Sequence, residues 1–168
     1  MTSIELLLDE ELEHAVLGEW WRLEDAGIPN QSRHTGVSNR PHVTLLWADA
    51  GVASAKLEDV TLPVALRLGA PILFGAGRKG VILARLVVPN RELLELHRAV
   101  HAQHSEATGI APKTLPGAWT PHVTLSRGIP MDQLVAALET LDTRAVLMGE
   151  AIAARHWDAS TAAITAVA

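Results

Sequence analysis

Cysteine is absent from the 168 residues of this sequence. Its absence excludes disulfides and thiolate metal sites and is in keeping with a reducing compartment. The sequence also lacks an apolar run approaching the roughly 18 residues that span a membrane. It has no low-complexity tract, and its first residues show no basic region followed by an apolar core. We therefore expect a cytoplasmic protein without a secretory signal or membrane span.

An excess of basic residues is missing as well. Lys and Arg number 14 against 19 Asp and Glu, which gives a net charge of −5. Proteins that grip long nucleic acids normally present a basic surface. The charge balance therefore argues against an extended nucleic-acid surface and favours a small nucleotide or an RNA end as partner. The composition is globular, with 48% hydrophobic residues, and the length predicts one domain, 1–168.

One five-residue sequence, Pro-His-Val-Thr-Leu, occurs twice, at 41–45 and at 121–125. The copies begin at positions 41 and 121 and are thus 80 residues apart, close to half of the 168-residue chain. This spacing predicts two related halves that each contribute one copy.

Each copy is typical of the beginning of a β-strand, because Val, Thr and Leu follow a Pro. Residues two apart share a face of a strand, so His42 and Thr44 point one way, and His122 and Thr124 do the same in the second copy. If the two halves face each other, two imidazoles and two hydroxyls meet in one cleft.

Two histidines beside one phosphorus atom suit phosphodiester chemistry. One imidazole takes a proton from the attacking oxygen and the other gives a proton to the leaving oxygen, since imidazole titrates near neutral pH. Threonine hydroxyls can donate hydrogen bonds to the phosphate oxygens as charge develops. The arrangement requires no metal, no cofactor and no covalent intermediate. The simpler alternative is a pair of surface strands that both happen to begin with Pro-His.

The two His-x-Thr motifs, each preceded by Pro and followed by Leu, resemble those of the two-histidine (2H) phosphoesterase superfamily. The sequence is most similar to the branch of 2'-5' RNA ligase-like and RNA 2',3'-cyclic phosphodiesterase-like proteins. The resemblance implies an α+β fold of two pseudo-twofold lobes, each an antiparallel sheet backed by helices, with a central cleft. It also implies metal-independent action on phosphodiesters, often 2',3'-cyclic ends.

The resemblance further implies roles for individual residues. His122 would activate water and His42 would protonate the departing oxygen, although the sequence leaves the reverse order open. The second copy continues to Arg127 in a His-x-Thr-Leu-x-Arg form, and the resemblance implies that this guanidinium binds phosphate. Strict alternation puts Arg127 on the face opposite His122, but Gly128 and Pro130 follow at once, where the strand ends and the backbone can turn.

Two tryptophans lie close to the motifs in sequence. Trp119 ends the loop before the second copy, and Trp47 stands in the first copy where the second has Arg127. We expect Trp47 to pack in the core, while for Trp119 core packing and stacking on a nucleobase are both open. Because the first copy lacks an arginine at this position, the two halves are expected to play different parts.

Three further features of the sequence have both a structural and a functional interpretation. The glycine-rich segment 75–80 contains Arg78 and Lys79 but lacks the spacing of a phosphate-binding P-loop, so a hairpin turn is preferred. The histidines at 97, 101 and 104 share one side of a predicted helix, where metal binding is conceivable, but boundary or solvated positions are favoured. His34, in a polar loop, is expected to be solvated.

The apolar patterns predict the remaining elements. Strands are expected at 3–8, 62–74, 80–88, 145–157 and 161–167, in addition to the two motif strands. Helices are expected from Asp9 to about Ala26, over 50–59, from Asn90 to about Thr108, and from Met131 to about Leu141.

Together these observations predict a cyclic phosphodiesterase that acts on a small cyclic nucleotide or an RNA 3' end. Its candidate site residues are His42 and His122 for catalysis and Thr44, Thr124, Arg127 and Trp119 for substrate binding. One alternative is a 2'-5' RNA ligase or RNA-end processing factor, because ligation is the reverse reaction. Another is a nucleotide-binding module that uses the same cleft without turnover.

Overall fold

The structure, a computed structural model, describes residues 1–33, 36, 38–77 and 80–168. The expectations for His34, Arg78 and Lys79 therefore lie outside the described residues. The described part contains seven strands: β1 Thr2–Leu8, β2 His42–Ala48, β3 Val64–Gly77, β4 Gly80–Val87, β5 His122–Ile129, β6 Leu147–Asp158 and β7 Ala163–Ala166. Its helices are α1 Glu10–Asp25, α2 Arg91–Gln103 and α3 Leu134–Glu139, with short 3-10 turns η1 Gln31–Arg33, η2 Pro112–Thr114 and η3 Met131–Gln133.

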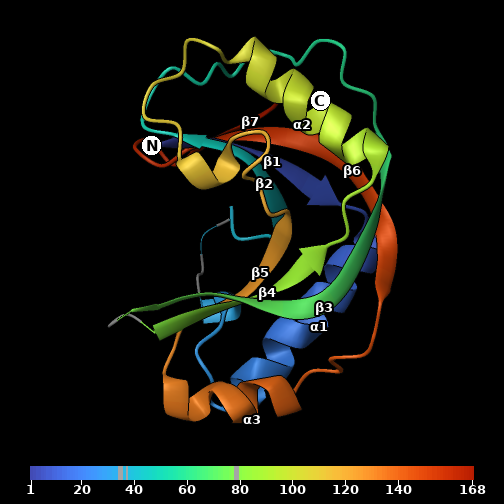
Figure 1. Cartoon of the computed structure of the whole chain (residues 1–168), viewed down its shortest axis with the longest axis vertical. Coiled ribbons are helices and arrows are strands. Elements are labelled where there is room, and N and C mark those ends of the chain that lie inside the picture. Colours follow the sequence, from blue (N-terminus) through green and yellow to red (C-terminus); the bar gives the residue numbers. More distant parts are fainter. Residues whose placement is uncertain (34–35, 37, 78–79) are drawn as a thin grey trace.

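The strands form two antiparallel groups that share β6 (Figure 1). The first half of β6 pairs with β3, and its second half pairs with β1. One group thus runs β7-β6-β1-β2 and the other β6-β3-β4-β5, and they meet again where β2 pairs with β5. The predicted α+β class with antiparallel sheets is confirmed, while the origin of the two groups by duplication stays a prediction.

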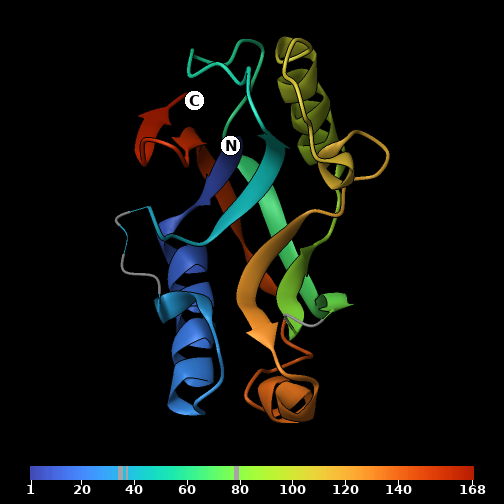
Figure 2. The same ribbon diagram turned by 90° about the vertical axis from the view of Figure 1, so that its left-hand side faces the viewer.

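Helix α1 begins where the sequence predicts. The Asp9 side chain accepts a hydrogen bond of 2.7 Å from the Leu12 amide, as an N-cap does, and three glutamates occupy the first turn, where the helix dipole favours them. The apolar stripe of Leu12, Val16, Trp20 and Leu23 is buried. Figure 2 shows α1 running along one side of the lower half of the molecule, separated from α2 in the upper half.

Helix α2 also begins as predicted, with Asn90 as its N-cap, but it ends at Gln103, before the predicted end near Thr108. The reason is a tertiary contact. The Thr108 amide donates to the Ala50 carbonyl at 3.0 Å, and this isolated β-bridge draws the chain away from the helix axis.

The helix predicted over 50–59 is wrong, because this segment is irregular. Gly51 has a φ of +81°, and a Cβ there would come within 3.0 Å of the Ala107 Cα. Asp59 also has a positive φ, of 51°. The Leu57 amide donates to the Val167 carbonyl at 2.8 Å. Contacts with the end of α2 and with the C-terminal residues therefore outweigh the helical pattern of the segment.

The hairpin interpretation of the glycine-rich segment is confirmed, since Gly77 pairs with Gly80 at the end of the β3–β4 ladder. Gly80 has a φ of +81°, and an added Cβ would lie 2.5 Å from the Ile129 carbonyl oxygen. This glycine therefore serves the close approach of β4 and β5.

The core between the strands and helices contains one fully buried arginine. Arg85 on β4 is 0% exposed and forms an ion pair with Glu19 on α1, which is 1% exposed. The same guanidinium donates to the carbonyls of Gly69, Ala145 and Asp142. Among the described residues, no helix has the length and apolar character required to cross a membrane.

Candidate active site

The two His-x-Thr motifs meet where β2 and β5 pair. Their middle residues, Val43 and Val123, are register partners in this antiparallel contact, and both are 0% exposed. Across an antiparallel pair, the residue before one partner lies beside the residue after the other. His42 therefore lies beside Thr124, and the second histidine lies beside Thr44, with all four side chains on the face opposite the buried valines.

Each motif histidine is held in the same way. The Nδ1 atom of His42 lies 2.7 Å from the Arg40 carbonyl oxygen, and that of His122 lies 2.8 Å from the Thr120 carbonyl oxygen. A carbonyl oxygen only accepts, so Nδ1 carries a proton and donates it in both rings. Nε2 is then the ring nitrogen left to exchange protons with a substrate.

An indole fixes the backbone of each motif threonine. Trp119 Nε1 donates to the Thr44 carbonyl at 3.0 Å, and Trp20 Nε1 donates to the Thr124 carbonyl at 3.1 Å. One indole comes from the loop before β5 and the other from α1, so two distant segments position the two hydroxyls in matching ways.

A β-bulge follows each threonine. In the β1–β2 ladder Glu5 pairs with Thr44 and Ile4 with Leu46, so Leu45 is an extra residue. In the β4–β5 ladder the pairs are Ala84 with Thr124 and Leu83 with Ser126, so Leu125 is the extra residue there. A bulge shifts the alternation of side chains by one residue and re-aims those that follow.

The bulges explain where Trp47 and Arg127 lie. Strict alternation predicts that Arg127 points away from His122, but the structure places it in the same cleft as Thr124. Trp47, expected in the core, is half-buried and lines the cleft at the matching position of the first motif. The bulges are a product of strand pairing, which periodicity alone does not reveal.

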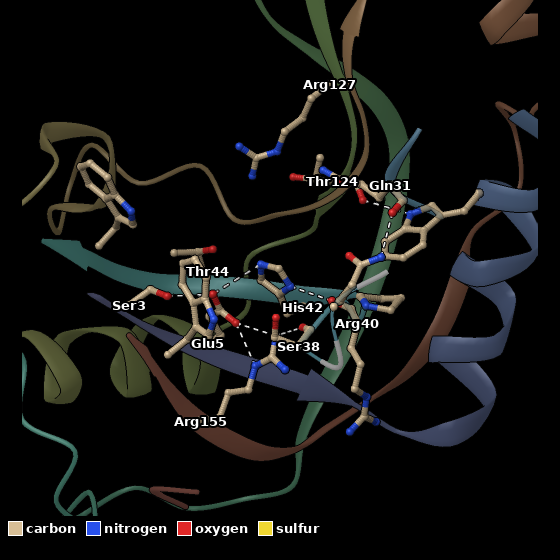
Figure 3. A pocket seen from close by; sticks show the side chains of 16 residues that line it. Ser3, Glu5, Gln31, Ser38, Arg40, His42, Thr44, Thr124, Arg127 and Arg155 are labelled. Atoms are coloured by element: carbon tan, nitrogen blue, oxygen red, sulfur yellow. Dashed lines mark hydrogen bonds and ion pairs between the residues drawn. The ribbon is translucent and has the colours of Figure 1, made fainter. Parts of the chain in front are cut away.

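The cleft consists of two adjoining cavities of about 570 and 300 Å³. Both are lined by the same five residues, His42, Thr44, Trp47, Thr124 and Arg127. The smaller cavity adds His122, Phe74, Lys113 and Trp119. The larger adds Glu5 and Arg155, and Figure 3 shows His42 between this pair and the Thr124–Arg127 side.

The surroundings of His122 favour its neutral form. Burial lowers the pKa of this imidazole below its usual value, and the hydrogen bond to Thr120 opposes the change only in part. The positive charges of Lys113, Arg127 and His42 lower the pKa further. The Phe74 ring lies against the imidazole, with 4.6 Å between ring centroids, and adds to the apolar wall.

Glu5 and Arg155 are polar residues of the site that the sequence interpretation missed. Burial alone raises the pKa of the Glu5 carboxyl, but His42, Arg155 and Ser3 together bring it below its usual value. The signal that could have drawn attention to Glu5 is a lone acidic residue inside the apolar run 4–8. Nothing comparable marks Arg155, which reaches the site only through the pairing of β6 with β1.

The expectation of boundary or solvated positions for the histidines at 97, 101 and 104 is wrong, because all three are buried and bound to backbone carbonyls. His97 Nε2 lies 2.9 Å from the Thr114 oxygen, and His101 Nε2 lies 3.2 Å from the Leu45 oxygen. His104 Nδ1 lies 2.8 Å from the Val100 oxygen. Within the described part of the chain, no group of three or more histidine or acidic side chains is arranged to hold a metal ion.

Trp119 lies on the wall of the cleft, as a base-stacking residue would, but one face of its ring is already covered. The His97 imidazole stacks on it with 3.9 Å between centroids and an interplanar angle of 0°. Its indole N–H is bound to the Thr44 carbonyl. The partly buried ring also packs against the core, and stacking of a nucleobase on Trp119 stays a prediction.

The stacked His97 is expected to make stability depend on pH. Burial, followed by the charge of His101, lowers its pKa to about 4, whereas an unfolded histidine titrates near 6.5. As pH falls through this window the unfolded chain gains a proton that the folded chain does not, so stability falls and then levels off below the folded pKa. Between pH 7 and 5 we expect this histidine to account for a loss of about 2 kcal/mol.

Urea denaturation at both pH values, compared between the wild type and His97→Gln, measures this contribution. The variant keeps a donor for the Thr114 carbonyl and is expected to lose less stability on acidification. Equal losses in the two proteins would show that His97 is not the group responsible.

The match to a family model agrees with the motif analysis. The sequence matches the model of one family, described as the 2'-5' RNA ligase superfamily, over residues 31–167, which include both motifs. A crystal structure of a phosphoesterase is similar, with 16% identity, a TM-score of 0.49 and coverage of 99% of this chain and 92% of the other. The E. coli protein LigT complexed with 3'-AMP is similar at 15% identity and a TM-score of 0.47, with 98% and 91% coverage. No curated protein sequence matches the chain.

Proposed function

Because the chain belongs to the 2'-5' RNA ligase superfamily of 2H phosphoesterases, we propose that it is a metal-independent phosphodiesterase that hydrolyses 2',3'-cyclic phosphate ends of nucleotides or RNA. The observation that carries the proposal is the meeting of both motifs at the Val43–Val123 pair. Both imidazoles, each with its Nδ1 hydrogen-bonded, line the smaller cavity together with the two threonines and Arg127.

In the proposed reaction, His122 accepts a proton from water while the water oxygen attacks phosphorus. The bond from phosphorus to the 2' or 3' oxygen breaks, and His42 donates a proton to that oxygen. Thr44 and Thr124 donate hydrogen bonds to the non-bridging oxygens, and Arg127 balances their charge. The product is a phosphomonoester, and exchange of protons with solvent restores both histidines.

The cleft supports a small substrate. Cavities of about 300 and 570 Å³ match the size of ordinary small-molecule sites. The net charge of −5 and the few cations in the cleft favour one nucleotide or an RNA 3' end over an extended strand. Action in the cytoplasm is part of the same proposal.

The test is turnover of the four 2',3'-cyclic mononucleotides in buffer containing EDTA, with separation of the 2'- and 3'-phosphate products. The blank is the protein with both His42 and His122 replaced by alanine. Product formation that survives EDTA and is absent from the blank supports the proposal. Activity that EDTA abolishes contradicts the metal-independent mechanism, and tight binding without turnover supports the binding-module alternative. Joined RNA ends from an RNA 2',3'-cyclic phosphate and a 5'-hydroxyl end would support ligation.

Replacing the cleft arginine is expected to weaken substrate use without abolishing it. Arg127→Met removes a cation that faces the phosphate, and we expect kcat/KM to fall by about 10- to 100-fold. Steady-state kinetics measure the change. Arg67→Met, which removes an exposed arginine outside both cavities, is the matched control and should leave kcat/KM unchanged. An equal effect of both substitutions would contradict a specific role for Arg127.

A further inference from the structure

A buried carboxylate stands beside one motif histidine. The Oε1 atom of Glu5 lies 3.7 Å from His42 Nε2 and accepts a hydrogen bond of 2.7 Å from Ser3 Oγ. Its Oε2 atom accepts a hydrogen bond of 2.9 Å from Arg155 Nε. Arg155 is itself fixed, because its Nη2 donates to the Ser38 carbonyl at 2.8 Å. Glu5 and Arg155 are 5% and 4% exposed, so neither side chain is free to move away.

Among the residues that the structure describes, the second motif has no such carboxylate partner. In the β1–β2 ladder Glu5 is the register partner of Thr44, and in the β4–β5 ladder the corresponding partner of Thr124 is Ala84. The two copies of Pro-His-Val-Thr-Leu are identical in sequence, so their difference arises from the neighbouring strand. An acidic residue flanks the first copy, while an alanine flanks the second.

The other charged groups around His42 lie on another side of the cleft or are themselves paired. Lys113, Arg127 and His122 approach from the η2 turn and β5 side of the cleft. The Arg40 guanidinium is bound to Glu13 on α1 at 2.9 Å, and Arg155 is paired with Glu5 itself. Of the described carboxylates that line the cleft, Glu5 is the one facing the imidazole.

The separation of 3.7 Å also matters for proton transfer. At this distance the carboxylate interacts favourably with a positive charge on the imidazole, but the two atoms are too far apart for a hydrogen bond. A proton on Nε2 would therefore be available to a leaving oxygen in the cleft. A direct hydrogen bond to Glu5 would have held that proton more tightly.

We propose that Glu5, fixed by Arg155 and Ser3, is a positioning residue that presents a negative charge to His42 alone and thereby gives the two identical motifs different roles, His42 as acid and His122 as base. This inference rests on the proposed phosphodiester hydrolysis. Glu5 acts through His42 and is not itself placed on the reacting atoms.

The direct test is an NMR titration of the His42 imidazole in the substrate-free protein, comparing wild type with Glu5→Gln. The midpoint is expected to fall by about one pH unit when the carboxylate is removed. Glu5→Asp keeps the charge and should restore most of the difference. Glu19→Gln is the matched control, because it also removes a buried carboxylate paired with an arginine but lies outside both cavities. A midpoint unchanged by Glu5→Gln, or lowered equally by Glu19→Gln, overturns the proposal.

The kinetic readout is the pH profile of kcat/KM on a 2',3'-cyclic nucleotide. In Glu5→Gln the basic limb should move to lower pH by about the same amount, since that limb reports the acid, while the acidic limb stays in place. A purely structural role would lower the rate without moving either limb. If Glu5→Gln does not fold, Glu5→Gln/Arg155→Gln removes both charges of the pair and should still lower the His42 midpoint.

Different results would contradict the role of Glu5 and the proposed phosphodiesterase function. Turnover by the wild type with an unmoved basic limb in Glu5→Gln overturns the role of Glu5 and leaves the diesterase standing. Absence of turnover on every cyclic phosphodiester overturns the proposed function and the catalytic role of Glu5 with it. The NMR midpoint then still decides whether Glu5 controls the charge of His42.

Discussion

Alanine in place of either motif histidine is expected to lower the turnover of a 2',3'-cyclic nucleotide by a factor of about 10² to 10⁴. Replacing both histidines should lower turnover little further. The acid and the base act in the same step, so either one contributes little to catalysis once the other is lost. Steady-state kinetics of His42→Ala, His122→Ala and the double variant measure this non-additivity. His14→Ala, on the exposed face of α1, is the control that should retain wild-type turnover.

The two single variants should also differ in their pH profiles. The lowered pKa of His122 fits a base that is already deprotonated at neutral pH, so His122→Ala should lose the acidic limb of kcat/KM. His42→Ala should lose the basic limb. If His122→Ala instead loses the basic limb and His42→Ala the acidic limb, the acid and base roles are exchanged. Wild-type turnover in either variant would show that the replaced histidine is not catalytic.

Loss of the buried arginine is expected to have the largest effect on stability. Arg85→Met leaves the Glu19 carboxylate buried without its cation, and breaking such a pair typically costs about 3 to 5 kcal/mol. It also leaves the carbonyls of Gly69, Ala145 and Asp142 without this donor. The free energy of unfolding in urea measures the loss.

The paired substitution Glu19→Gln/Arg85→Met should be less destabilised than the sum of the two single changes, because no uncompensated charge stays buried. Arg67→Met, at an exposed position, should change stability by less than about 0.5 kcal/mol. Additive losses in the paired variant would mean that the Arg85–Glu19 interaction contributes little and that packing dominates.

The motif residues could be predicted because their signal is local. The repeat and the period of two place His42 with Thr44 and His122 with Thr124, and the meeting at Val43–Val123 brings both pairs to one face. The partners that set their charge are not local. Arg155 reaches Glu5 across 150 residues of sequence, and only the strand order makes them neighbours.

Backbone irregularities account for the remaining differences between prediction and structure. The bulges at Leu45 and Leu125 depend on what the neighbouring strand offers, so Arg127 and Trp47 turn into the cleft against the simple alternation. The helix expected over 50–59 does not form for a similar reason. The backbone of this segment contacts Ala107 and the last residues of the chain instead.

The shared strand β6 has a mechanical consequence for the cleft. The pairings β1-β2-β5-β4-β3-β6 return to β1, so the strands form a closed circuit with the motif junction on one side and β6 on the other. Figure 1 shows the two strand groups joined by β6. Two separated attachments are expected to resist both shear and hinge bending between the groups. We therefore expect the spacing between the two imidazoles to be set before a substrate arrives, so that a ligand is selected by its fit to a preformed site instead of by closure of the molecule around it.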